Sequence, residues 1–158
     1  MNTTAPSPYG NGRAIAVGSD HVGLDLRVTL MDELQAAGFE ILDHGTATYD
    51  RVDYPDIAYP VARAVADGAV QFGLLICGTG AGMQIAANRH PAVRAVVISD
   101  FFTARHARAH NDANVACLGA RTVTPVVASE LVQTFLTTEF EQGRHQRRID
   151  KLSEPPFP

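Results

Sequence analysis

Short apolar runs alternate with longer amphipathic stretches along this chain, and this alternation constrains the fold more than any other feature of the sequence. The stretches between and after the apolar runs are expected to form helices. Strands and helices that alternate in this way form a parallel sheet covered on both faces. The sequence therefore predicts one α/β domain, a Rossmann-like three-layer α/β/α sandwich around a five-stranded parallel sheet. The strands are expected at residues 14–17, 39–42, 72–76, 94–98 and 115–118.

Polar and small residues mark where several of the expected helices begin and end. Gly38 and Gly68 follow the first two helices, as glycines often do at helix ends. Asp100 is a natural N-cap for the helix that runs towards His110. The last long helix is expected to begin at Thr124-Pro125, an N-cap followed by a first-turn proline.

The length of 158 residues fits a single domain that buries roughly 70% of the surface of its unfolded chain. Residues 1–13 are polar and lack the apolar stretch of a signal peptide, so we expect a disordered lead-in to a domain over residues 14–152. Two cysteines make no disulfide framework, and no apolar run approaches the roughly 18 residues of a membrane span. We expect a cytoplasmic protein with free thiols and no membrane partner.

The net charge of −4 argues against general binding of nucleic acid, which requires a basic face. A small anionic ligand remains compatible, because a few arginines in a cleft are enough to hold it. In a parallel sheet such a ligand binds beyond the carboxyl ends of the strands. The candidate residues are therefore those directly after each strand, at 19–21, 44–48, 77–82, 99–100 and 119–121.

The exit of the third strand, Ile76 to Met83, carries the most chemical information. Gly78, Gly80 and Gly82 let the backbone approach a ligand with its N–H groups, a geometry that binds a phosphate or a reaction oxyanion. A thiol at the mouth of this turn, Cys77, is favoured as a thiolate by the positive end of the following helix. Proton abstraction beside a carbonyl needs such a base and such donors. The other interpretation is a small buried side chain at a strand end.

Three other patterns allow a functional and a structural interpretation. A dinucleotide site at the glycine-rich turn is disfavoured, because its third glycine should stand at position 83, which is Met. Asp20 and His21 follow the first strand and are expected to face the cleft, although Asp20 also suits an N-cap. His106 and His110 have the spacing of half a zinc site, but no carboxylate motif accompanies them, so no metal is predicted.

The segment Gly143 to Arg148 concentrates cations in an acidic protein, together with Arg121. Arginine side chains suit phosphate oxygens. The segment lies past the last expected helix and has no obvious place to pack within its own domain. We interpret it as a basic tail that reaches a partner subunit, the alternative being a solvated tail.

Taken together, these segments resemble the sugar-phosphate isomerase family that groups ribose-5-phosphate isomerase type B with galactose-6-phosphate isomerase. They occur in the order and spacing of the family over about residues 14–152. The matching segments are 18–23, 53–56, 76–83, 85–88, 110–114, 118–121 and 140–148.

The resemblance implies a role for each candidate residue. Cys77 would be the base that moves the proton between C1 and C2, and Thr79 with the amides of residues 78–82 would hold the enediolate. Asp20 and His110 would assist opening of the furanose ring. Tyr54 and Asn111 would line the sugar. The phosphate would be held by His21, Arg121, Arg144 and Arg148.

The resemblance further implies an isomerase of carbohydrate metabolism, in the pentose phosphate pathway, that needs neither cofactor nor metal. Ribose 5-phosphate and ribulose 5-phosphate are the leading substrate pair. Allose 6-phosphate, galactose 6-phosphate or a tetrose phosphate remain alternatives, as does a non-catalytic module that binds a nucleotide or sugar phosphate. A homodimer or homotetramer with active sites shared between subunits is expected. Some members use a glutamate base, but here Gln84 stands in the turn, which favours Cys77.

Overall fold

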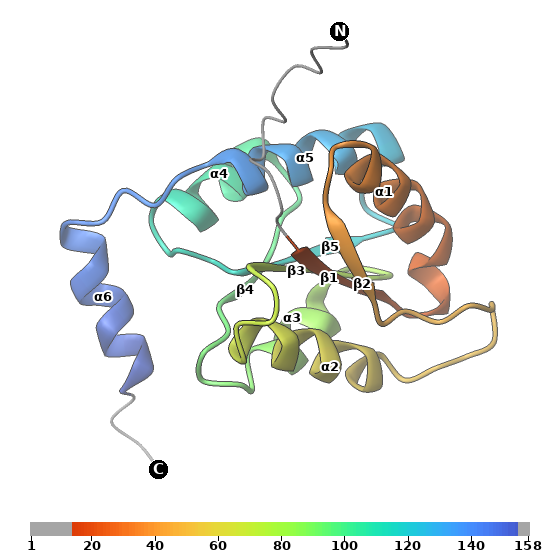
Figure 1. Cartoon of the computed structure of the whole chain (residues 1–158), viewed down its shortest axis with the longest axis horizontal. Helices are drawn as coiled ribbons and strands as arrows, with labels where there is room; N and C mark the ends of the chain where they lie inside the picture. Colours follow the sequence, from red (N-terminus) through yellow and green to blue (C-terminus); the bar gives the residue numbers. More distant parts are fainter. Residues whose placement is uncertain (1–13, 155–158) are drawn as a thin grey trace, which may run out of the picture.

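The computed structural model describes residues 14–154 and contains the predicted five-stranded parallel sheet (Figure 1). The strand order is β2-β1-β3-β5-β4, and all four pairings are parallel. The predicted lead-in, residues 1–13, lies outside the described residues. The strands are β1 (Ala14–Ser19), β2 (Glu40–Asp43), β3 (Phe72–Cys77), β4 (Ala95–Val97) and β5 (Val115–Gly119).

Helices cover both faces of the sheet, as the three-layer prediction requires (Figure 1). On one face α1 (Leu24–Ala36), α4 (Phe101–Ala109) and α5 (Pro125–Thr137) bury apolar residues such as Leu30 and Phe135 against the sheet. On the other face α2 (Tyr54–Ala66) and α3 (Ala81–Ala87) form a second core with residues such as Val61 and Met83. Two separate cores therefore hold the sheet rigid between them. None of the helices in residues 14–154 is long and apolar enough to cross a bilayer.

The helix starts are fixed by the capping residues that the sequence indicates. The Asp100 carboxylate accepts the N–H of Thr103 at 2.7 Å, and the Thr124 hydroxyl caps α5. Asp20 precedes a 3-10 turn, η1 (His21–Gly23), and its carboxylate accepts two backbone N–H groups there. The N-cap interpretation of Asp20 is thus confirmed, and the cap fixes the direction in which the chain leaves β1.

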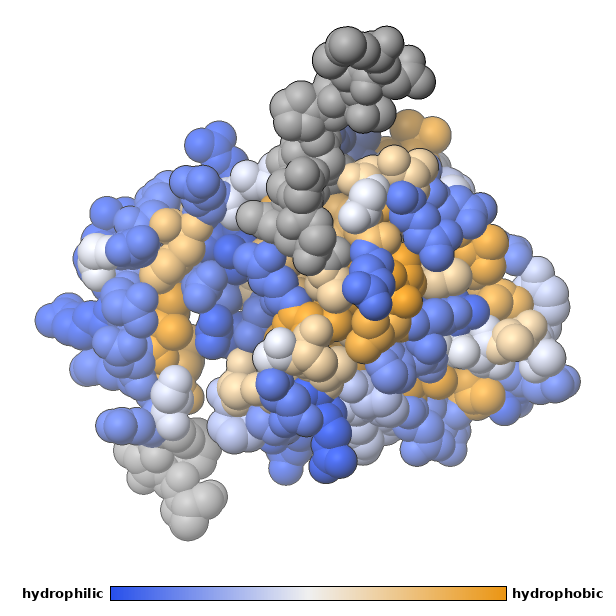
Figure 2. Space-filling model, viewed as in Figure 1, coloured by the Kyte–Doolittle hydropathy of each residue, from blue (hydrophilic) through white to orange (hydrophobic). Residues whose placement is uncertain are grey.

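The basic segment after α5 forms a further helix, α6 (Arg144–Ser153), which the sequence did not predict. The helix is amphipathic, because His145 and Ile149 lie four residues apart and are both buried, whereas its arginines are exposed. It stands beside the β4 edge of the sandwich (Figure 1), and Figure 2 shows apolar side chains between charged ones in this part of the surface. The expectation that this segment has no place to pack in its own domain is therefore wrong for these two residues.

Candidate active site

The turn between β3 and α3 places the Cys77 thiol at the carboxyl edge of the sheet. Cys77 is the last residue of β3 and is 6% exposed. The Gly80 N–H points at its Sγ atom, with 3.1 Å between nitrogen and sulfur. Gly80 has a φ of +81°, a conformation that glycine adopts without strain. The turn therefore aims a backbone dipole at the sulfur, which stabilises negative charge on it.

The glycines of this turn also have packing roles that the sequence did not reveal. A Cβ at Gly82 would lie 2.9 Å from the ring of Tyr54, and a Cβ at Gly80 would lie 3.2 Å from the backbone of Leu118. The turn is thus packed tightly between the start of α2 and the end of β5. Tyr54 therefore packs against this turn. The family resemblance implies that the same residue lines the sugar.

Arg121 and the end of β1 complete the surroundings of Cys77. The Arg121 N–H donates to the carbonyl of Gly78 at 3.0 Å, and its exposed side chain lies 3.8 Å from where a Cβ of Gly78 would be. On the other side of the turn, the Asp20 N–H donates to the Ile76 carbonyl at 3.2 Å. The predicted residues Asp20, His21, Tyr54, Cys77, Thr79 and Arg121 are thus gathered at one edge of the sheet.

His110 and Asn111 lie at the opposite edge. They follow α4, which leads from the carboxyl end of β4 to the amino end of β5. The sheet register places Cys77 level with Gly119, the last residue of β5, so the five residues of β5 separate the two groups. At about 3.3 Å per residue this is roughly 16 Å, too far for His110 to reach the thiol of its own chain.

Side chains from α6 join His110 at this amino edge. The imidazole rings of His110 and His145 are stacked, with centroids 4.2 Å apart and planes 11° apart. Burial lowers the pKa of His145, and the positive charges of His110, Arg144 and Arg148 lower it further. Arg144 and Arg148, both predicted to bind phosphate, are exposed on the same helix. The predicted site residues therefore form two groups, one at each edge.

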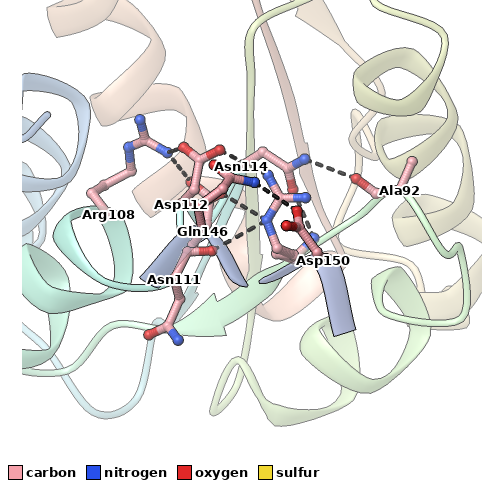
Figure 3. Close-up of polar contacts among 9 residues, drawn as sticks. Ala92, Arg108, Asn111, Asp112, Asn114, Gln146 and Asp150 are labelled. Atoms are coloured by element: carbon pink, nitrogen blue, oxygen red, sulfur yellow. Dashed lines mark hydrogen bonds and ion pairs between the residues drawn. The ribbon is translucent and has the colours of Figure 1, made fainter. Parts of the chain in front are cut away.

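A clamp around Asp112 fixes the backbone of the His110–Asp112 turn (Figure 3). Asp112 has a φ of +44°, and its carboxylate pairs with Arg94 at 3.1 Å and with Arg108 at 2.7 Å. Arg94 also donates to the carbonyl oxygens of Asn111 and Asp112. In Figure 3 the Asn111 side chain points away from this clamp, so it is presented outward. Sequence reasoning missed the clamp because nothing in the spacing of its members singles it out.

The family model described as Ribose/Galactose Isomerase matches residues 15–152. The chain belongs to this family. The resemblance seen in the sequence is thereby confirmed, and the two edges of the sheet carry the motifs on which it rested.

Individual members of the family align along most of this chain. Ribose-5-phosphate isomerase B of Escherichia coli K12 is 44% identical over 141 residues, covering 89% of this chain and 95% of the relative. The D-erythrulose-4-phosphate isomerase of Pectobacterium atrosepticum is 40% identical over 140 residues, covering 88% and 92%. The structure of Mycoplasma genitalium ribose-5-phosphate isomerase B with bound ribulose 5-phosphate superimposes with a TM-score of 0.87 at 41% identity, covering 90% and 95%.

A buried arginine beside the carboxyl edge also escaped the sequence analysis. Arg27 is 3% exposed, and its guanidinium pairs with Asp43 at 2.9 Å and donates to the Thr46 carbonyl at 2.6 Å. It thereby holds the loop after β2, which approaches His21 through the Val52 N–H. In the sequence Arg27 falls inside an amphipathic helix, where a charged residue normally indicates a solvated face.

Proposed function

We propose that this protein interconverts ribose 5-phosphate and ribulose 5-phosphate, with Cys77 as the base. The observation that carries the proposal is the Cys77 thiol, held at the mouth of a glycine-rich turn with the Gly80 N–H directed at its sulfur. A nucleophile or base in this position needs a substrate that binds at the carboxyl edge of the sheet. The family supplies the class of that substrate, a phosphorylated aldose or ketose.

The reaction moves one proton between two carbons and one between two oxygens, and it exchanges no electrons with a cofactor. The Cys77 thiolate removes the proton from C2 of the open-chain aldose, which leaves an enediolate. Backbone N–H groups of the Gly78–Gly82 turn and the Thr79 hydroxyl donate hydrogen bonds to the enediolate oxygens. The protonated thiol then returns the proton to C1, and a proton moves from the C2 hydroxyl oxygen to the C1 oxygen through these groups. The product is the ketose, and the thiolate is regenerated.

The active site is proposed to be shared between two copies of the chain. Cys77 and His110 lie at opposite edges of one sheet, so His110 of the partner subunit would serve each Cys77. Together with Asp20 it would open the furanose ring, Asp20 and the imidazole handling the protons of the C1 hydroxyl and the ring oxygen. Asn111 and the α6 arginines would arrive from the partner with it. A homodimer is the smallest assembly that completes such a site.

The phosphate is proposed to lie between His21 and Arg121 of one chain and Arg144 and Arg148 of the other. Arg121 is exposed beside the turn, and its guanidinium suits the oxygens of a phosphate. Arg144 and Arg148 are exposed as well, because α6 buries its other face. A positive cluster of this kind explains how a protein with a net charge of −4 binds an anionic sugar.

A tetrose phosphate is the second candidate substrate, since a family member of 40% identity is a D-erythrulose-4-phosphate isomerase. The experiment is a panel of ribose 5-phosphate, allose 6-phosphate, galactose 6-phosphate and erythrose 4-phosphate, assayed for ketose formation. We expect the highest kcat/KM with ribose 5-phosphate. A higher value with the tetrose would select the second candidate, and no turnover of any member would leave only the non-catalytic binding module.

A further inference from the structure

Three potential metal ligands converge where α4 ends and α6 begins. The Nε2 atom of His110 lies 3.5 Å from the Glu141 carboxylate, and the Nε2 atom of His145 lies 3.8 Å from the same oxygen. One ligand atom from each of the three lies within 4.8 Å of the others. In a tetrahedral zinc site, with ligands at 2.0–2.2 Å, neighbouring ligand atoms are about 3.4 Å apart. The carboxylate is therefore already at nearly the required separation from both imidazoles.

His145 provides a second observation that points to a ligand. The residue is 4% exposed, yet its Nε2 atom has no hydrogen-bond partner among residues 14–154. A buried polar atom without a partner is uncommon and costs stability. This nitrogen faces the Glu141 carboxylate, with 3.8 Å between the two atoms. A neutral imidazole has the free lone pair that a metal ion requires.

The backbone holds the three residues close to one another. The Glu141 N–H donates to the Ala109 carbonyl at 2.9 Å, which ties Glu141 to the end of α4. The His145 N–H donates to the Gln142 carbonyl at 3.1 Å, in a turn where Gln142 has a φ of +57°. The two stacked rings must turn apart for their lone pairs to converge. The His110 side chain is partly exposed, which gives it room to do so.

We propose that His110, Glu141 and His145 bind one divalent transition-metal ion of the zinc type, with water completing the coordination. Two imidazoles and one carboxylate are a ligand set that suits zinc. In the sequence, only His106 and His110 have the spacing of zinc ligands, and no carboxylate motif accompanies them. His106 is not one of the converging ligands: its ring contacts that of His110 edge-on, but its Nδ1 atom is bonded to the Phe102 carbonyl. Arg144 and Arg148 stand nearby and oppose a cation, which weakens binding.

Occupation of this site inhibits the isomerase, a consequence that rests on the proposed function. The ion takes the Nε2 atom of His110, which then cannot exchange a proton with the sugar ring. The protein would thus lose activity in zinc without any change at Cys77.

The binding test is a calorimetric Zn²⁺ titration of the full chain, with the visible absorption of Co²⁺ as a measure of four-coordinate geometry. We expect one ion per chain. Glu141→Gln and His145→Gln should each weaken binding at least tenfold. Glu141 is exposed, so its variant keeps the fold even if His145→Gln does not. The exposed His90→Gln is the matched control and should bind like the parent protein. Equal binding by Glu141→Gln and the parent, or no binding by the parent, overturns the site.

The inhibition test separates this inference from the proposed function. Zinc should inhibit ribose 5-phosphate turnover in the parent protein at the concentration that fills the calorimetric site. Glu141→Gln, compared with its own zinc-free rate, should need at least tenfold more zinc. Equal inhibition of both proteins would place the inhibitory ion elsewhere, for example on Cys77, and overturn the regulatory consequence. An inactive parent protein that binds zinc as described contradicts the proposed function alone.

Discussion

The two edges of the sheet carry site residues in different ways. At the carboxyl edge, Cys77 is surrounded by backbone: a turn pressed between Tyr54 and β5, with the Gly80 N–H on the thiol. At the amino edge, His110 stands on a turn fixed by side chains, chiefly the two arginines that pair with Asp112. The first edge resembles a pre-formed oxyanion site. At the second, the Asp112 clamp fixes a turn whose side chains point outward. The residues to which the family resemblance assigns catalytic roles are divided between the two edges.

The largest expected effect is at the carboxyl edge, from Cys77→Ala. We expect kcat for ribose 5-phosphate to fall by about 10²–10⁴, the usual contribution of a general base, with KM changed only severalfold. Steady-state kinetics measure both. The matched control is Cys117→Ala, which removes the other buried thiol, on the same sheet but away from the turn. Full activity of Cys77→Ala would show that another group is the base.

At the amino edge, Asp112→Ala tests whether the ion pairs of the Asp112 clamp stabilise the protein. The change leaves Arg108 without its carboxylate and places alanine at a φ of +44°. We expect a loss of about 1–3 kcal/mol in the free energy of unfolding, measured with urea, and a lower kcat. Asp112→Asn, which tolerates this φ and still accepts hydrogen bonds, is the control and should lose less. Parental stability of Asp112→Asn would show that the ion pairs contribute little, and equal losses for both variants would show that the backbone conformation and the neutral hydrogen bonds contribute little.

A smaller effect is expected from Gly82→Ala at the carboxyl edge. The new Cβ would lie 2.9 Å from the exposed ring of Tyr54, which must move away from the turn. We expect kcat/KM to fall about tenfold, within the usual cost of overpacking. Adding Gly82→Ala to Tyr54→Ala should then have no further effect. A full additional loss in the double variant would mean that Gly82 acts on the substrate directly.

The smallest expected effect is the pH dependence of stability at the amino edge. The pKa of His145 lies below its ordinary value of 6.5 because the ring is buried near positive charges. The unfolded chain therefore binds this proton more readily, and the free energy of unfolding should decrease as the pH falls below about 6.5. His145→Gln should flatten the dependence, whereas the exposed His90→Gln should not. Identical pH profiles for the parent and His145→Gln would contradict the lowered pKa.

Much of the fold could be predicted because the apolar runs and their caps are local signals. The strand boundaries moved by one or two residues, and Asp100 and Thr124 cap the expected helices. Helix α6 was missed because its apolar positions are few and its composition resembles a solvated tail. Its inward face is apparent only in the structure, where His145 and Ile149 are buried.

The candidate site likewise contains features that local sequence patterns reveal and features that only the structure reveals. The Cys77 turn could be found because its glycines and thiol are contiguous in the sequence. The Arg94–Asp112 and Arg27–Asp43 pairs could not, since each joins two different segments of the chain. The distance between Cys77 and His110 likewise follows only from the sheet register, which places them at opposite edges.

The most direct test of a site shared between two chains is complementation between Cys77→Ala and His110→Ala. Each variant alone should be nearly inactive. When equal amounts are mixed and allowed to exchange subunits, half of the dimers combine both chains, and each of these contains one intact site. Activity should therefore return to about a quarter of that of the parent protein. A mixture that exchanges subunits but stays as inactive as its components would contradict the shared site.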